Sequence, residues 1–177
     1  MRHFRLLLAL VFLAARADIV TCQCDLSHPE TLQARSCSLC REAEQQPESV
    51  HVFFLKDASP TKPNRWLALP RLHERSFDQL PPELRAELLR AAMEKAQALF
   101  GNDWGIAYNA PEVQTQCHVH LHIGKWMPAV ENAQFITVQR IEDVPVPPKG
   151  EGFWIHPVGK TFHVHTGETI TETVLER

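Results

Sequence analysis

Residues 117–123, CHVHLHI, constrain the fold more than any other stretch because histidine and apolar residues alternate strictly along them. Side chains of a β-strand point alternately to its two faces. We therefore expect a strand whose apolar face is buried and whose other face presents three imidazoles, namely His118, His120 and His122. In a core, every ring nitrogen of such a row would need a hydrogen-bond partner. The pattern therefore favours a functional site.

Composition limits the class of protein. The chain has 177 residues, of which 44% are hydrophobic and 22% charged, and its formal net charge is −3. This is enough for one globular domain with its own core, and it is not the composition of a disordered chain. A slightly acidic chain is a poor match for a nucleic-acid surface, so we expect no nucleic-acid partner.

The rest of the chain predicts an α+β domain with an antiparallel sheet. A helix is expected over 79–100, where leucine and alanine recur near the helical period and Gly101 follows. A short helix should carry the cysteines of residues 36–46. Strands are expected at 49–55, 65–70, 104–110, 117–123 and 134–141, with one or two more in 161–176.

The N-terminus has the pattern of an export signal. MRHFR is a basic start, LLLALVFLAA is a short apolar run and ARA at 15–17 suits cleavage. We expect residues 1–17 to be a signal peptide, the protein to be periplasmic or secreted, and no stable membrane span, because the apolar run is too short. A lipid anchor at Cys22 is an alternative.

Five cysteines, an odd number, are compatible with disulfides, a metal site or both. Cys37 and Cys40 form a C-x-x-C, which is a metal-ligand or redox spacing. In an oxidising compartment the alternatives are a bond between these two cysteines or bonds to Cys22 or Cys24. Cys117 falls on the strand face opposite the histidines, and we expect it to be a buried free thiol.

Two kinds of chemistry suit the histidine row. Histidines two residues apart on a strand can hold a zinc ion that activates water. Alternatively, a neutral imidazole can attack phosphorus and form a phosphoramidate that water later hydrolyses, while a neighbouring histidine supports the phosphate.

The surrounding motifs resemble those of the histidine triad (HIT) family of nucleotide hydrolases and transferases. HVHLHI fits the family signature, and DASPTKPNRWLALPRLH (57–73) fits the segment before its helix. CSLC, the Asn of YNA, and Gln114 occupy matching positions, so the likeness covers residues 36–123. It implies a HIT-like sheet of about five strands with one long helix in residues 18–127. Residues 128–177 would then be a β-rich C-terminal extension packed on the same domain.

The resemblance also implies roles. His120 would be the nucleophile and His122 its support at the phosphate. The residues expected to bind substrate are Asp57, Asn109, Gln114 and Thr115. The residues expected to hold a structural zinc are Cys37, Cys40, His73 and His118. The partner would be a nucleotide or a nucleotide-linked small molecule, and a homodimer is possible.

The function expected on this basis is hydrolysis or nucleotidyl transfer through a nucleotidyl-histidine intermediate. The bond broken would be a phosphoramidate, a phosphoanhydride or a phosphate ester. The alternatives are a CDP-diacylglycerol-type pyrophosphatase, a hydrolase with the triad as zinc ligands, and a non-catalytic zinc-stabilised nucleotide-binding module. The tail holds His156, His163 and His165. We expect either an exposed histidine face or a second metal site, with Glu168 near the last two histidines.

Overall fold

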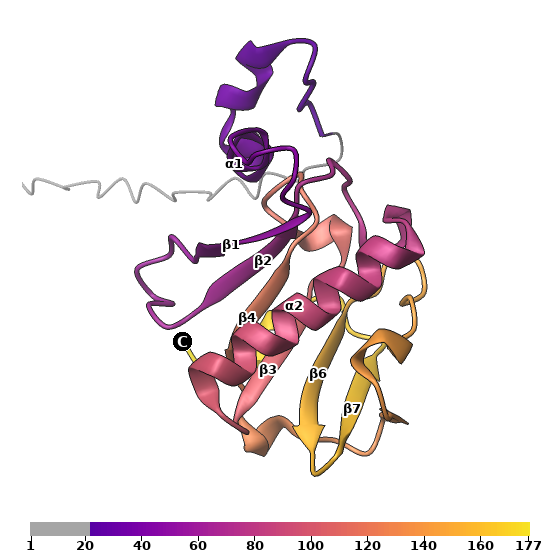
Figure 1. The fold of residues 1–177 in the computed structure, drawn as a ribbon. Coiled ribbons are helices and arrows are strands. Elements are labelled where there is room, and N and C mark those ends of the chain that lie inside the picture. Colours follow the sequence, from indigo (N-terminus) through magenta and orange to yellow (C-terminus); the bar gives the residue numbers. More distant parts are fainter. Residues whose placement is uncertain (1–21) are drawn as a thin grey trace, which may run out of the picture.

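The computed structural model describes residues 22–177, so the expected signal peptide at 1–17 lies outside the described residues. One antiparallel sheet of seven strands forms the body of the protein, in the order β1-β2-β4-β3-β6-β7-β5 (Figure 1). The strands are β1 Val52–Lys56, β2 Trp66–Pro70, β3 Trp104–Tyr108, β4 Leu121–Lys125, β5 Ile136–Val138, β6 Phe153–Val158 and β7 Thr161–Thr166. The α-helices in the described part are α1 Ser38–Glu44 and α2 Pro82–Phe100.

This architecture corrects the expected fold class. The expected HIT-like sheet of about five strands with one long helix and a β-rich C-terminal extension is wrong, because the described chain has seven strands in one sheet and two α-helices. β6 lies inside the sheet, where Ile155 pairs with Ile106 of β3. Local sequence does not reveal this pairing, since β4 and β5 lie between β3 and β6 in the chain and the paired residues are far apart in sequence.

Helix α2 covers one face of the sheet. Its buried positions, Leu88, Leu89, Ala92 and Ala96, pack on the apolar side chains of β3 and β4 such as Ile106. The helix begins at Pro82, after an extended residue at Leu80 and the N-cap Pro81, because proline has no backbone N–H and suits the first turn. This layer is the main core of the domain.

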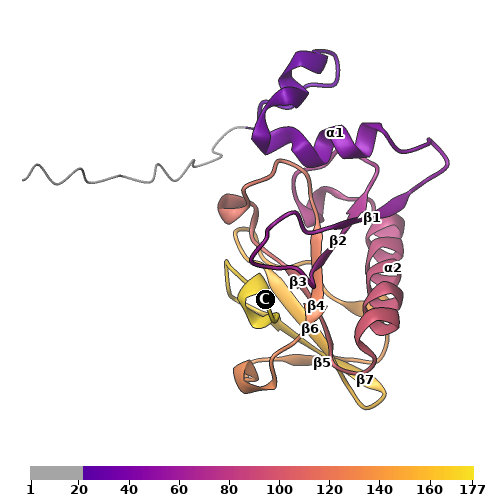
Figure 2. The ribbon, with the colours of Figure 1, turned by 90° about the vertical axis from the view of Figure 1, so that its left-hand side faces the viewer.

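The C-terminal segment covers the opposite face (Figure 2). A 3₁₀ helix at Glu172–Val174 leads to Leu175, which packs with Ala107 and Trp154 in a second apolar cluster. Gly105 of β3 permits this approach, since a Cβ there would lie 2.6 Å from Leu175 Cδ2. The C-terminal segment therefore partly covers the face of the sheet that carries the triad histidines.

Candidate functional site

The histidine row is only partly strand. The strand expected at 117–123 is wrong at its start, because β4 begins at Leu121 and His118 and His120 precede it. The backbone before Leu121 instead bonds elsewhere, with the N–H of Val119 donating to Glu74 O. The alternation of side chains nevertheless persists, because Val119, Leu121 and Ile123 all lie in the core. The rings of His120 and His122 neighbour each other, with their centroids 4.9 Å apart.

His120 is held in one tautomer by the backbone. Its Nδ1 lies 2.7 Å from the carbonyl oxygen of His118, which can only accept a hydrogen bond. Nδ1 therefore carries the proton and Nε2 carries the lone pair. Burial lowers the pKa of His120, although the nearby carboxylates of Glu172 and Asp57 oppose this shift. The ring is consequently a neutral imidazole near pH 7, with a nucleophilic Nε2.

His122 is oriented by Asn109. The Asn109 Oδ1 accepts the backbone N–H groups of Thr171 (2.8 Å) and Glu172 (3.0 Å), so the amide orientation is fixed. Its Nδ2 then lies 3.5 Å from His122 Nε2 and is the donor of that pair. The proton of neutral His122 is accordingly on Nδ1, 3.5 Å from a carboxylate oxygen of Glu172. Burial above all, with a smaller electrostatic effect of the cations Lys62 and Arg65, keeps the pKa of His122 well below its ordinary value.

Glu172 joins the site from the far end of the chain. Its carboxylate lies 2.6 Å from Lys62 Nζ and 2.8 Å from Arg65 Nη1. Two cations and His122 therefore surround one anionic position. Lys62, Arg65 and Glu172 could not be predicted as site residues, because no local pattern links residues that stand more than a hundred positions apart in the sequence.

Arg65 ties the C-terminal segment to the sheet. Besides Glu172, its guanidinium donates to the carbonyl oxygens of Leu175 and Glu176. The Arg65 residue is only 2% exposed, and burial lowers its pKa from the ordinary value. The planar fork of arginine suits this role, since it satisfies several acceptors at once. Arg65 is thus the structural cation of the pair, whereas Lys62 is the more exposed one.

The four expected substrate-binding residues differ in their placement. Asn109 is in the site, and Gln114 supports it by donating from Nε2 to Asn109 O at 2.6 Å. Asp57 Oδ1 accepts the N–H of Ser59, as in an Asx turn, yet its charge reaches His120. Thr115 is exposed on the loop before His118. The structure therefore brings Asn109, Gln114 and Asp57 toward the histidines and leaves Thr115 at the surface.

Three of the four expected zinc ligands come together. Ligand atoms of Cys40, His73 and His118 lie within 4.8 Å of one another. His118 Nε2 donates to Pro70 O at 2.8 Å, which leaves its buried Nδ1 with a lone pair and no hydrogen-bond partner. His73 Nε2 lies 2.8 Å from a carboxylate oxygen of Glu44. Such carbonyl and carboxylate partners are typical of metal-binding histidines, so these three groups fit zinc.

Cys37 does not fit that set. It forms a disulfide with Cys24, and the thiol expected to be free, Cys117, forms one with Cys22. The prediction of a free Cys117 is therefore wrong: the chain turns before β4, and Cys117 meets the N-terminal cysteines there. Cys40 is the free thiol of the described chain, and burial raises its pKa to about 11. A metal there would have to displace the thiol proton.

Access to the histidines is narrow. His120 and His122 are each 6% exposed. Two cavities, of about 720 and 390 Å³, are lined by other residues, the first including Tyr108, Pro111 and Lys149. Glu172, which lies beside His122, and its partner Lys62 are half-buried, with side chains that are 20% and 25% exposed. A substrate would therefore approach the histidines past this ion pair.

Comparison with protein-family models and with curated proteins gives no match for the chain. Among residues 22–177, no helix combines the length and the apolar character needed to cross a membrane.

Proposed function

We propose that this protein is a hydrolase or nucleotidyl transferase that works by the chemistry of the histidine triad family, with His120 as the nucleophile. The observation that carries the proposal is the hydrogen bond from His120 Nδ1 to His118 O. It leaves Nε2 as the lone-pair nitrogen of a buried, neutral ring. Nucleophilic catalysis by imidazole needs this tautomer and this charge state.

The reaction would proceed in two displacements. His120 Nε2 attacks the phosphorus of a nucleotide-linked substrate, forming an N–P bond as the bond to the leaving group breaks and the leaving group takes up a proton from solvent. Water then attacks the phosphorus and gives a proton back to solvent, and the N–P bond breaks to release the nucleoside monophosphate and restore neutral His120. If another acceptor replaces water, the same step is a nucleotidyl transfer.

Lys62 is the cation in this site that suits a phosphate. Its ammonium group pairs with Glu172 and acts electrostatically on His120 and His122, and its side chain is 25% exposed. A substrate phosphate is an anion, like the Glu172 carboxylate, and can pair with Lys62 in the same way. We therefore assign Lys62 to binding the phosphate and His122 to hydrogen bonding at the phosphate oxygens. Asp57 and Thr115 stand on the two loops flanking the histidines, where we propose that they contact the ribose and the leaving group.

We further propose that Cys40, His73 and His118 hold a zinc ion. Zinc at His118 would fix the peptide carbonyl that orients His120, so the metal would act by positioning and not by activating water. The disulfide between Cys24 and Cys37 leaves the fourth position without the expected cysteine. Cys24→Ser would release Cys37, and we expect that change to tighten zinc binding in a competition with a chelator.

Two disulfides favour an exported protein, since such bonds persist in oxidising compartments. Because the Cys22 sulfur is bonded to Cys117, it has no thiol left for a lipid. We therefore propose a periplasmic or secreted enzyme without a lipid anchor at this residue. A homodimer stays a prediction.

The test is a mass-spectrometric screen of the wild-type protein against nucleoside phosphoramidates, dinucleotides and CDP-lipids. Wild type should release a nucleoside monophosphate from at least one class, and His120→Asn should not. His51→Asn is the matched control, because His51 is an exposed histidine paired only with Glu87 among the described ion pairs. Turnover that a chelator abolishes at once would favour a metal-dependent hydrolase. Nucleotide binding without turnover by wild type would favour a binding module.

A further inference from the structure

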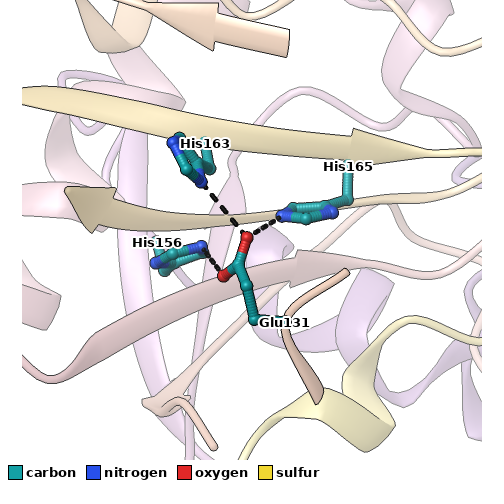
Figure 3. A group of neighbouring side chains, drawn as sticks. All are labelled: Glu131, His156, His163 and His165. Atoms are coloured by element: carbon teal, nitrogen blue, oxygen red, sulfur yellow. Dashed lines mark hydrogen bonds and ion pairs between the residues drawn. The ribbon is translucent and has the colours of Figure 1, made fainter. Parts of the chain in front are cut away.

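A second group of histidines lies on the same face of the sheet as the triad but farther along it. It consists of Glu131, His156, His163 and His165, and Figure 3 shows their side chains converging. One ligand atom from each lies within 4.8 Å of all the others. Two of the three histidines are buried, so the expectation of an exposed histidine face is wrong. The expected Glu168 is absent from the group, and instead lies near Trp154.

The fold builds this group from two strands and a loop. His156 of β6 pairs in register with His163 of β7, and Trp154 pairs with His165. The alternate residues Ile155 and Val164 point into the core under α2, so the histidines share the opposite face. Glu131 follows the 3₁₀ helix Pro128–Val130, in a segment joined to the C-terminus by the bond from Met127 N to Val174 O. None of these neighbours is close in sequence to Glu131.

The contacts leave several nitrogens unsatisfied. The Glu131 carboxylate lies 2.6 Å from His156 Nε2, 3.2 Å from His163 Nδ1 and 3.3 Å from His165 Nε2. His156 Nε2 and His165 Nε2 are buried and meet this carboxylate without the geometry of a hydrogen bond, and His156 Nδ1 is buried without a hydrogen bond. A buried polar group without a partner costs about 1–3 kcal/mol, so such groups usually have a function or a bound partner.

The donor set of this group also suits a metal cation. Each imidazole offers a ring nitrogen and Glu131 offers a carboxylate oxygen, and these atoms converge on one position. Nitrogen and oxygen donors of this kind are the usual ligands of transition-metal ions in proteins.

Each imidazole is held in place by an aromatic ring. Trp154 stacks on His165 with centroids 3.5 Å apart, Trp126 on His156 at 3.9 Å and Phe135 on His163 at 3.7 Å. In addition, His165 Nδ1 lies 3.4 Å from Asn132 Oδ1, and donation to that oxygen leaves Nε2 with the lone pair. Rings locked by packing and by outer hydrogen bonds are the mark of a preorganised metal site.

We propose that Glu131, His156, His163 and His165 bind one divalent transition-metal ion through three nitrogens and a carboxylate oxygen. Imidazole donors favour zinc, cobalt, nickel, copper or iron over magnesium and calcium, which prefer oxygen ligands. The site is independent of the proposed hydrolysis. His122 pairs with Ala107, Ala107 with Trp154, and Trp154 with His165. Three such strand spacings of about 4.8 Å put the two groups about 14 Å apart.

The experiment titrates Co²⁺ and Zn²⁺ into the purified, chelator-treated wild-type chain. Tryptophan fluorescence reports this site, because Trp126 and Trp154 stack on two of its ligands. A thiolate-to-cobalt absorption band reports Cys40 separately. We expect Co²⁺ to quench the fluorescence and Zn²⁺ to compete with it, whereas Mg²⁺ should not.

The variants remove ligands where the surface tolerates change. Glu131→Gln and Glu131→Gln/His163→Gln alter the two more exposed ligands, and circular dichroism verifies their fold. The double variant should weaken Co²⁺ binding by more than about 100-fold, because losing a group that merely orients a ligand already costs about 10–100-fold. The matched control, His51→Gln/Glu87→Gln, removes an exposed histidine–glutamate pair and should bind as wild type does.

The proposal is overturned if Co²⁺ leaves the tryptophan fluorescence of folded wild type unchanged, or if Mg²⁺ displaces Co²⁺ as well as Zn²⁺ does. It is also overturned if Glu131→Gln, which keeps the shape of the side chain, retains wild-type affinity. Equal weakening by the control pair would show that surface histidines bind the metal. None of these results bears on His120, so failure here and failure of the proposed hydrolase are distinguishable.

Discussion

Arg65→Met should detach the C-terminal segment from the face that carries the triad. Arg65 is 2% exposed and donates to the Glu172 carboxylate and to the carbonyl oxygens of Leu175 and Glu176. Methionine fills a similar volume without any donor. Lys62 remains beside Glu172 in the variant, so the carboxylate is not left wholly unpaired. The two carbonyl oxygens, however, lose their donor at a buried position.

Breaking a buried ion pair lowers the free energy of unfolding by about 3–5 kcal/mol. We expect the cost of Arg65→Met to lie at the lower end of this range. A surface pair gives the scale for comparison. Arg90 and Glu142 lie 3.0 Å apart, but the Arg90 side chain is 49% exposed. Because exposed pairs contribute about 0–1 kcal/mol, Arg90→Met should cost less than about 1 kcal/mol.

Urea unfolding followed by circular dichroism measures both costs from the shift in midpoint at constant slope. A double-mutant cycle with Glu172→Gln should give a coupling energy near the top of the usual range of about 0.5–3 kcal/mol. If Arg65→Met and Arg90→Met destabilise the protein equally, or if the cycle gives no coupling, then Arg65 does not hold the segment and the account of this face is wrong.

Three further predictions concern the site. Asn109→Ala should lower turnover by about 10²–10³-fold, because it removes the donor to His122 and the acceptor of two backbone N–H groups, and steady-state kinetics on folded protein would measure it. Since burial lowers the pKa of His120, kcat/KM should stay level as the pH falls from 8 through 6.5; a half-loss near 6.5 would indicate an exposed imidazole. Histidines with lowered pKa values, including His118 at about 4, bind fewer protons in the folded than in the unfolded state. The free energy of unfolding should therefore be highest above about pH 6.5 and should fall as the pH drops toward 4. Urea midpoints measured at pH 7.5 and 5 with a chelator present would check this, and an equal or higher midpoint at pH 5 would contradict it.

Much of the local structure near the triad could be predicted from sequence. The segments expected as the first two strands form the antiparallel pair β1 and β2, and Val119, Leu121 and Ile123 enter the core as their alternation indicated. These features depend on neighbours within one element or one hairpin. Local periodicity reports such burial directly.

The number of strands and the partners of the histidines could not be predicted in this way. β6 joins β3 through a long-range pairing, and Glu172 reaches Lys62 from a part of the chain without clear periodicity. The same holds for Glu131, which meets three histidines only because a loop folds back over β6 and β7. A carboxylate in a polar loop has no local signal that it will face a charge elsewhere.

The pairing of the cysteines also could not be predicted from the sequence. The sequence allowed Cys37 to pair with Cys40 or with the N-terminal cysteines, or to bind metal, and spacing alone does not choose among these. The structure pairs it with Cys24 because the N-terminal segment lies against the 3₁₀ turn that precedes α1. That arrangement, not the C-x-x-C itself, decides which thiol is available to zinc.

The proposed reaction requires that His120 becomes covalently attached to the nucleotide. The most direct measurement is rapid acid-free quenching of wild type with a substrate found in the screen, followed by peptide mass spectrometry and zinc analysis of the same samples. We expect a nucleoside monophosphate on the peptide carrying His120, no adduct in His120→Asn, and equal zinc in both proteins. Turnover by wild type without any adduct, together with loss of zinc in His120→Asn, would contradict it.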